Sequence, residues 1–148
     1  MKWGDRQLSV EWEICESGPA GAERTVLLPG GLNTARSYAE LMAQPALARI
    51  HLIAATLPGH GGTPPPADFS IENYARLGSK LAADHGCDAV VGFSIGARVA
   101  LEMAASGGFS GPVVLLGISL SLADEPAVLR VMDRLGAPPA SLRLSAAR

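Results

Sequence analysis

The sequence has few cysteines, no excess of basic side chains and no long uninterrupted apolar run. Cys15 and Cys87 are its two cysteines, too few for the disulfide framework of a small secreted domain, and their spacing suits neither a metal site nor a redox pair. Twelve basic and fourteen acidic side chains give a formal charge of −2, so no positive field is available to bind a polyanion. We therefore expect no nucleic-acid partner, and a reducing, cytoplasmic location.

The apolar segments are too short to cross a bilayer. Gly, Ser or Arg interrupts each of them well before the roughly 18 apolar residues that a transmembrane helix needs. The segment Met1–Arg6 lacks the apolar core of a signal peptide. We expect neither a membrane partner nor export.

Length and composition fit one globular domain. The chain has 148 residues, of which 48% are hydrophobic and 18% charged, as in a domain whose sheet is buried on both faces. Strands are predicted within residues 8–16, 25–28, 50–57, 88–91 and 112–118, and helices within residues 38–47, 71–81, 95–105 and 125–135. Alternating strands and helices of this kind predict an α/β fold, a three-layer sandwich around a mostly parallel sheet.

Two local patterns refine this prediction. Ser70 is a suitable N-cap for the helix that follows it. In the first strand Val10, Trp12 and Ile14 alternate with polar residues such as Glu11 and Glu13, which is typical of a half-exposed strand whose acidic side chains face the solvent.

The segment Gly92–Gly96 matches the G-x-S-x-G motif between a predicted strand and a predicted helix, the context that gives the motif its meaning. A serine on such a turn needs small neighbours because strand and helix crowd together, which accounts for Gly92 and Gly96. We predict that Ser94 is a nucleophile and that the N–H of Ile95 stabilises an oxyanion at the helix amino terminus. The simpler interpretation is a tight turn closed by glycines. A phosphate-binding loop is excluded because neither G-x-G-x-x-G nor G-K-[ST] occurs here.

Three segments together resemble the α/β-hydrolase family: Leu27–Gly31, Leu57–Thr63 and Gly92–Gly96. They span most of the chain up to about the sixth strand of the family, so the resemblance implies an incomplete α/β-hydrolase fold. In the family the first segment supplies a second oxyanion N–H, which falls on Gly31 if Pro29 takes the place of the usual histidine. Because this chain has Pro29 where the family usually has a histidine, Gly31 and Leu32 remain alternatives for the residue that supplies this N–H. The second segment resembles a loop of the family that shapes the rim of the substrate pocket and is not usually catalytic. The resemblance therefore implies a structural role for His60 rather than a catalytic one.

The resemblance implies a catalytic acid and a histidine after the nucleophile, in that order. No histidine follows Ser94, and Asp124 is the candidate acid. The interpretation that we favour is that Asp124 caps the helix predicted to begin at Glu125. We expect residues 1–123 to form the amino-terminal part of the hydrolase core and residues 124–148 to begin a cap segment or an irregular tail.

The function that this resemblance implies is serine hydrolysis of a small-molecule ester or acyl substrate through an acyl-serine intermediate, without cofactor or metal. Two alternatives remain open. One is a catalytically dead fragment or a binding protein that keeps the hydrolase shape, and the other is a subunit completed by a partner chain.

The first prediction concerns the 148 residues expressed alone. Without a histidine after Ser94 the hydroxyl attacks as a neutral alcohol, and only the oxyanion donors and binding remain, which in serine proteases supply roughly 10³–10⁴-fold over water. We expect no useful steady-state hydrolysis of p-nitrophenyl acetate by the purified monomer. Hydrolysis that is lost on Ser94→Ala would contradict this and would make His60 the first base to test.

Overall fold

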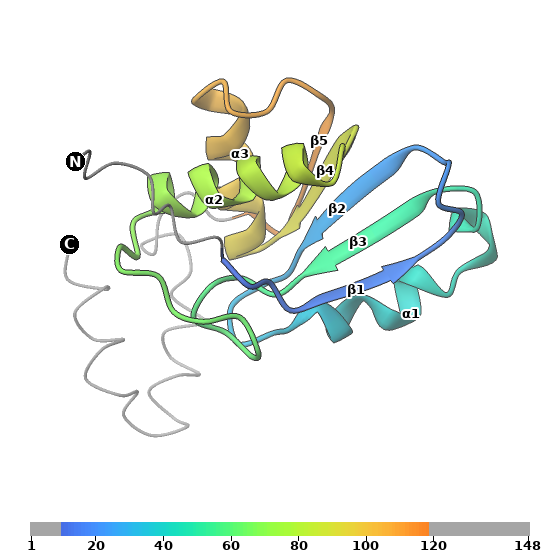
Figure 1. Cartoon of the computed structure of the whole chain (residues 1–148), viewed down its shortest axis with the longest axis horizontal. Coiled ribbons are helices and arrows are strands. Elements are labelled where there is room, and N and C mark those ends of the chain that lie inside the picture. The colour runs from blue at the N-terminus through green and yellow to red at the C-terminus, as the bar shows by residue number, and fades with distance from the viewer. Residues whose placement is uncertain (1–9, 119–148) are drawn as a thin grey trace, which may run out of the picture. The chain divides into compact units, whose positions relative to one another are not determined.

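The computed structural model describes residues 10–118, which form a five-stranded sheet with helices on both faces (Figure 1). The sheet order is β1-β3-β2-β4-β5, with β1 antiparallel to β3 and all other neighbours parallel. The strands are β1 (Ile14–Ser17), β2 (Arg24–Leu28), β3 (His51–Ala55), β4 (Ala89–Phe93) and β5 (Val113–Leu116). The α-helices are α1 (Ala39–Met42), α2 (Ile71–Asp84) and α3 (Ile95–Ala105), and the 3₁₀ helices are η1 (Ala35–Tyr38) and η2 (Pro45–Leu47).

The two core clusters lie on opposite faces of the sheet. On one face α2 and α3 pack over the strands through Tyr74, Leu81, Val99 and Met103. On the other face η1, through Ala35 and Tyr38, packs over Leu27 and Leu52, with Met42 of α1 and Leu47 of η2 against it. Figure 1 shows α1 on the opposite side of the sheet from α2 and α3. This confirms the predicted three-layer arrangement.

The central strands are apolar because both of their faces are covered. All five residues of β3 are buried, and in β2 the three residues from Val26 to Leu28 are buried. A parallel strand packed on both faces has no solvent side on which polar residues could alternate. Helix α2 begins where expected, because the Ser70 hydroxyl accepts a hydrogen bond from Asn73 N at 3.2 Å.

Two sequence predictions were inaccurate in this region. The helix predicted over residues 38–47 is broken into η1, α1 and η2, and Pro45 begins the last piece because it lacks the N–H that a continuing helix requires. The first strand begins only at Ile14. The Glu13 side chain is half-buried and hydrogen-bonded rather than free in solvent, since the loop after β3 covers it.

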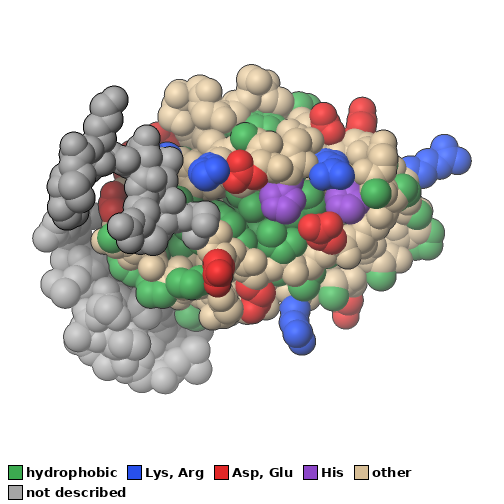
Figure 2. Space-filling view, viewed as in Figure 1, with side chains coloured by type: hydrophobic (Ala, Val, Ile, Leu, Met, Phe, Trp, Pro, Cys, Tyr) green, Lys and Arg blue, Asp and Glu red, His purple; other side chains and the backbone are tan. Residues whose placement is uncertain are grey.

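Within residues 10–118 no helix is both long and apolar enough to cross a membrane. In Figure 2 acidic and basic side chains are interspersed over the face in view. The helix predicted at residues 125–135 and the segment 124–148 lie outside the described residues.

Strand β5 is the last strand of the described sheet, and its outward face is apolar. Val114 is 46% exposed and Leu116 is 45% exposed, whereas Val113 and Leu115 pack against the cluster under α2 and α3. An apolar strand at a sheet edge offers unpaired backbone groups to another chain. We therefore propose that this edge supports self-association of the chain.

The second prediction tests that edge. The double variant Val114→Lys with Leu116→Lys should reduce self-association, because charges on an edge strand oppose pairing with a second copy. Sedimentation velocity across a concentration series measures the effect. Leu101→Lys is the matched control, since Leu101 is an exposed apolar residue of α3 rather than of the edge. A wild-type chain that stays monomeric at high concentration would contradict the expectation.

Candidate active site

Ser94 occupies a strained turn between β4 and α3. Its backbone has φ 54° and ψ −116°, and Ser94 and Leu32 are the two non-glycine residues with positive φ among residues 10–118. A non-glycine residue in such a conformation persists only where its surroundings enforce it, and such residues cluster at functional sites. The serine therefore has the strand-turn-helix setting that the motif predicts.

The two motif glycines are required by close backbone contacts. A β-carbon on Gly92 would collide with the backbone of Gly96 and Ala97, and one on Gly96 would collide with the carbonyl oxygens of Leu28 and Pro29. These obstacles are main-chain atoms, which cannot move aside as the end of a flexible side chain can. Glycine at both positions is what lets α3 begin directly beside the end of β2.

Hydrogen bonds hold the Ser94 backbone from both sides. Ser94 N donates to Leu116 O of β5 at 2.9 Å, and Ser94 O accepts from Ala97 N at 3.0 Å and from Arg98 N at 3.2 Å. The N–H of Ile95 comes before the first donors of the helix and has no earlier turn to bond to. It is therefore available to an anion at the positive end of the helix dipole.

Gly31 lies beside this helix amino terminus. A β-carbon on Gly31 would be 3.9 Å from Ile95 Cγ2, so the loop after β2 and the start of α3 are neighbours. The loop turns sharply, because Asn33 N donates to Gly30 O at 3.3 Å and Leu32 has φ 64° with 87% of its surface exposed. Two predicted oxyanion residues that lie far apart in the sequence are thus brought together.

Tyr38 anchors the end of β2 that leads into this loop. Its hydroxyl donates to Leu28 O at 2.8 Å, and burial raises the pKa of Tyr38 to about 12. The phenol therefore keeps its proton, and its donor role, throughout the neutral range.

The histidines divide between the two ends of the sheet. His51 begins β3 and bonds Glu16 Oε2 at 3.1 Å through Nε2, and His85 caps the carboxyl end of α2. Ser94 follows the carboxyl end of β4, whereas His51 is paired with Arg24 at the amino end of β2, so the two lie roughly 20 Å apart. His60 follows β3 on the same side of the sheet as Ser94, and its Nδ1 lies 3.3 Å from Pro58 O. Within residues 10–118, none of the three hydrogen-bonds to Ser94.

Other candidate groups do not join the site. Burial raises the pKa of the Cys87 thiol to about 11, so it is not a thiolate near neutral pH. Among residues 10–118, no group of three or more His, Cys, Asp or Glu residues could hold a metal ion. Asp124, the candidate acid, lies outside the described residues.

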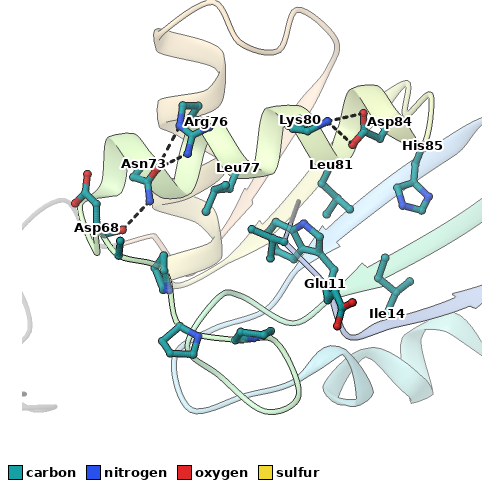
Figure 3. A pocket seen from close by; sticks show the side chains of 16 residues that line it. Glu11, Ile14, Asp68, Asn73, Arg76, Leu77, Lys80, Leu81, Asp84 and His85 are labelled. Carbon is teal, nitrogen blue, oxygen red and sulfur yellow. Dashed lines mark hydrogen bonds and ion pairs between the residues drawn. The ribbon is translucent and has the colours of Figure 1, made fainter. Parts of the chain in front are cut away.

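A cavity of about 760 Å³ lies beside α2 and does not include Ser94. Neither Ser94 nor Gly31 lines it, and its walls come from residues 10–14, residues 64–68 and α2. Figure 3 shows hydrogen bonds along α2 at its wall, from Lys80 to Asp84 and from Arg76 to Asn73.

The strand-turn-helix geometry agrees with a comparison against protein families. Residues 25–148 match the model of the alpha/beta hydrolase family. The chain belongs to the α/β-hydrolase family. No curated protein matches this hydrolase chain in sequence.

Solved structures with different activities share the hydrolase fold of this chain. Epoxide hydrolase A from Mycobacterium thermoresistibile has 25% identity and a TM-score of 0.65, and the match covers 83% of this chain and 41% of the epoxide hydrolase. The N-acyl homoserine lactonase AidH has 22% identity and a TM-score of 0.61, and the match covers 76% of this chain and 43% of the lactonase. The thioesterase domain from the curacin biosynthetic pathway has 19% identity and a TM-score of 0.65, and the match covers 85% of this chain and 52% of the thioesterase domain. The present chain therefore spans about half the length of these hydrolases, or less.

The third prediction tests the steric origin of the motif. Gly96→Val should destabilise the fold by about 1–3 kcal/mol, because the side chain would overpack against the Leu28 and Pro29 carbonyl oxygens. Gly31→Ala is the matched control, expected to change stability by less than about 0.5 kcal/mol because its β-carbon meets only Ile95 at ordinary contact distance. Urea unfolding measures both. Equal stability of the two variants would mean that the turn is ordinary.

Proposed function

We propose that the protein is a serine hydrolase that cleaves a small-molecule carboxylic ester through an acyl-serine intermediate on Ser94. The observation that carries the proposal is the strained Ser94 backbone at the start of α3. Family membership supports hydrolysis in general, and the identity of the residue on the turn supports this particular chemistry.

The reaction can be followed atom by atom. The Ser94 oxygen attacks the ester carbonyl carbon and its proton passes to a base, while the carbonyl oxygen becomes an oxyanion facing the N–H groups of Ile95 and Gly31. The tetrahedral intermediate then expels the alcohol, which leaves with a proton from the protonated base. Water attacks the acyl-serine in the same way and releases the carboxylic acid.

A serine nucleophile favours acyl substrates over epoxides. Attack on an epoxide carbon would join Ser94 to the substrate as an ether, which has no carbonyl that water could attack, so the enzyme would be trapped after one turnover. An acyl-serine retains a carbonyl and can be hydrolysed. Two of the similar structures carry names of acyl-transfer enzymes, a lactonase and a thioesterase, which agrees with this preference.

Apolar side chains beside the nucleophile favour an uncharged substrate. The exposed Leu32 follows Gly31, and Phe93, which precedes the nucleophile, is 44% exposed. The Phe93 ring lies against Gly30, since a β-carbon there would be 3.1 Å from Phe93 Cδ1. A substrate bound at Ser94 would therefore meet apolar surface on the oxyanion loop and on the nucleophile turn.

The alternatives are a binding protein of the same shape and a subunit completed by a partner chain. The absence of a hydrogen bond between Ser94 and any of the three histidines within residues 10–118 favours them. A base could be supplied by further residues of the hydrolase fold, because the similar structures are about twice as long.

The fourth prediction separates these functions. In any form of the protein that hydrolyses an ester, Ser94→Ala should lower turnover by roughly 10³-fold or more while leaving the fold intact. Ser94→Gly should do the same and also raise stability by about 1 kcal/mol, because glycine relieves the positive φ. Ester hydrolysis and urea unfolding provide the two readouts.

Ser106→Ala is the control, because Ser106 caps the far end of α3. Ester turnover that survives in Ser94→Ala would remove Ser94 as the nucleophile. A protein that hydrolyses no ester in any form but still binds esters would favour the binding function.

A further inference from the structure

Glu13 joins two loops that flank the candidate site. Its carboxylate accepts a hydrogen bond from Thr56 Oγ1 at 2.7 Å through Oε1 and one from Gly62 N at 2.9 Å through Oε2. Thr56 follows β3, and Gly62 belongs to the loop that contains His60. Both carboxylate oxygens are therefore used by residues more than forty positions away.

Thr56 passes this connection to the oxyanion loop. Its hydroxyl is fully buried and accepts from Ala35 N at 2.7 Å. Because a backbone N–H can only donate, the hydroxyl oxygen must accept from Ala35, and its proton points to Glu13. Ala35 begins η1 directly after the loop that contains Gly31. One continuous set of bonds thus runs from the oxyanion loop to the carboxylate.

Backbone and side-chain contacts reinforce the same junction. Thr56 N donates to Glu13 O at 2.9 Å, and Glu13 N donates to Thr63 Oγ1 at 2.9 Å. The Thr63 hydroxyl in turn donates to Thr56 O at 2.8 Å. The two loops also touch directly, since a β-carbon on Gly61 would be 2.7 Å from Thr34 Cγ2. Thr56 and Thr63 are both buried, so water cannot substitute for these bonds without opening the loops.

The oxyanion loop is consequently held at each of its ends. Tyr38 bonds Leu28 O where the loop leaves β2, and Thr56 bonds Ala35 N where the loop enters η1. Gly31 lies between these two anchors. An oxyanion donor is effective only when it is held in place before charge develops, and the second anchor depends on the Glu13 carboxylate.

We propose that Glu13, acting through Thr56, is a positioning residue that sets the place of the Gly31 N–H and ties it to the loop containing His60. The proposal rests on the proposed function for its chemical consequence, since a displaced Gly31 would weaken oxyanion stabilisation at Ser94. Its structural part stands on the hydrogen bonds alone.

Amide measurements on the 148-residue chain test the structural part independently of catalysis. Thr56→Val keeps the shape of the side chain but removes the hydroxyl. It should speed hydrogen exchange at Ala35 N–H by roughly tenfold, the scale set by losing one hydrogen bond. It should also shift the NMR amide resonances of Gly31 and Leu32. Tyr74 N–H, which bonds Ser70 O in α2, is the internal reference and should not change.

Glu13→Gln tests the carboxylate itself. The glutamine side chain has one acceptor oxygen and one NH₂ group, so it cannot accept from both Gly62 N and the Thr56 hydroxyl. The NMR amide resonances of Gly62 and Gly31 should therefore both shift. Thr56→Ser restores the hydroxyl and should return the wild-type pattern. Glu16→Gln is the matched control, because the Glu16 carboxylate bonds His51 instead. The double variant Glu13→Gln with Thr56→Val should move Gly31 no further than Thr56→Val does.

In a form of the protein that hydrolyses an ester, labelling of Ser94 by a fluorophosphonate tests the chemical consequence. Glu13→Gln and Thr56→Val should slow labelling several-fold, whereas Thr56→Ser and Glu16→Gln should label as the wild-type chain does. If Thr56→Val leaves Ala35 exchange and the Gly31 resonance unchanged, the positioning role is overturned whatever the labelling result. If those signals change but the wild-type chain does not label in any form, the proposed function fails and the loop connection stands.

Discussion

The amino terminus of α3 lies so close to the ends of β2 and β4 that neither Gly92 nor Gly96 has room for a β-carbon. At that approach Ser94 has a positive φ, and the N–H of Ile95 has no earlier helical turn to bond to. It also brings Gly31 to the same place, because the loop that contains Gly31 leaves the strand end against which Gly96 packs. The placement of the proposed nucleophile and of the proposed oxyanion donors therefore follows from one steric constraint.

Because β2, β3 and β4 are parallel, the remaining parts of the candidate site lie together at the carboxyl ends of these strands. The loops after β2, β3 and β4 all emerge at the carboxyl ends of neighbouring strands, where ligands of open α/β sheets bind. The antiparallel edge strand β1 takes part as well, because Glu13, the residue before it, reaches the loops after β2 and β3. A residue at the margin of the sheet is thus hydrogen-bonded to the loops beside the candidate site.

The chemistry follows from which side chain is on the turn, and the fold alone does not decide it. Similar structures carry the names of an epoxide hydrolase, a lactonase and a thioesterase, so the shared scaffold is compatible with several reactions. In this chain a serine is on the turn, and serine is a productive nucleophile only when the covalent product retains a carbonyl for water to attack.

Short stretches of sequence were sufficient to predict the helix α3 and the cap at Ser70, which depend on contacts a few residues apart, and the α/β class, which depends on uninterrupted apolar strands. The turn at Ser94 was predictable because its glycines form a short motif, although the contacts that require Gly96 are with a distant strand end. The resemblance to the family added Gly31. Tertiary structure alone decided that Gly31 meets Ile95 and that Glu13 is a hydrogen-bonded group rather than a solvated one. The break before η2 has a local cause, because Pro45 lacks the N–H that a continuing helix requires. Alternation in a strand indicates which side chains share a face, but it does not say which loop will cover that face. That depends on the order β1-β3-β2-β4, which places Glu13 beside residues far away in the sequence.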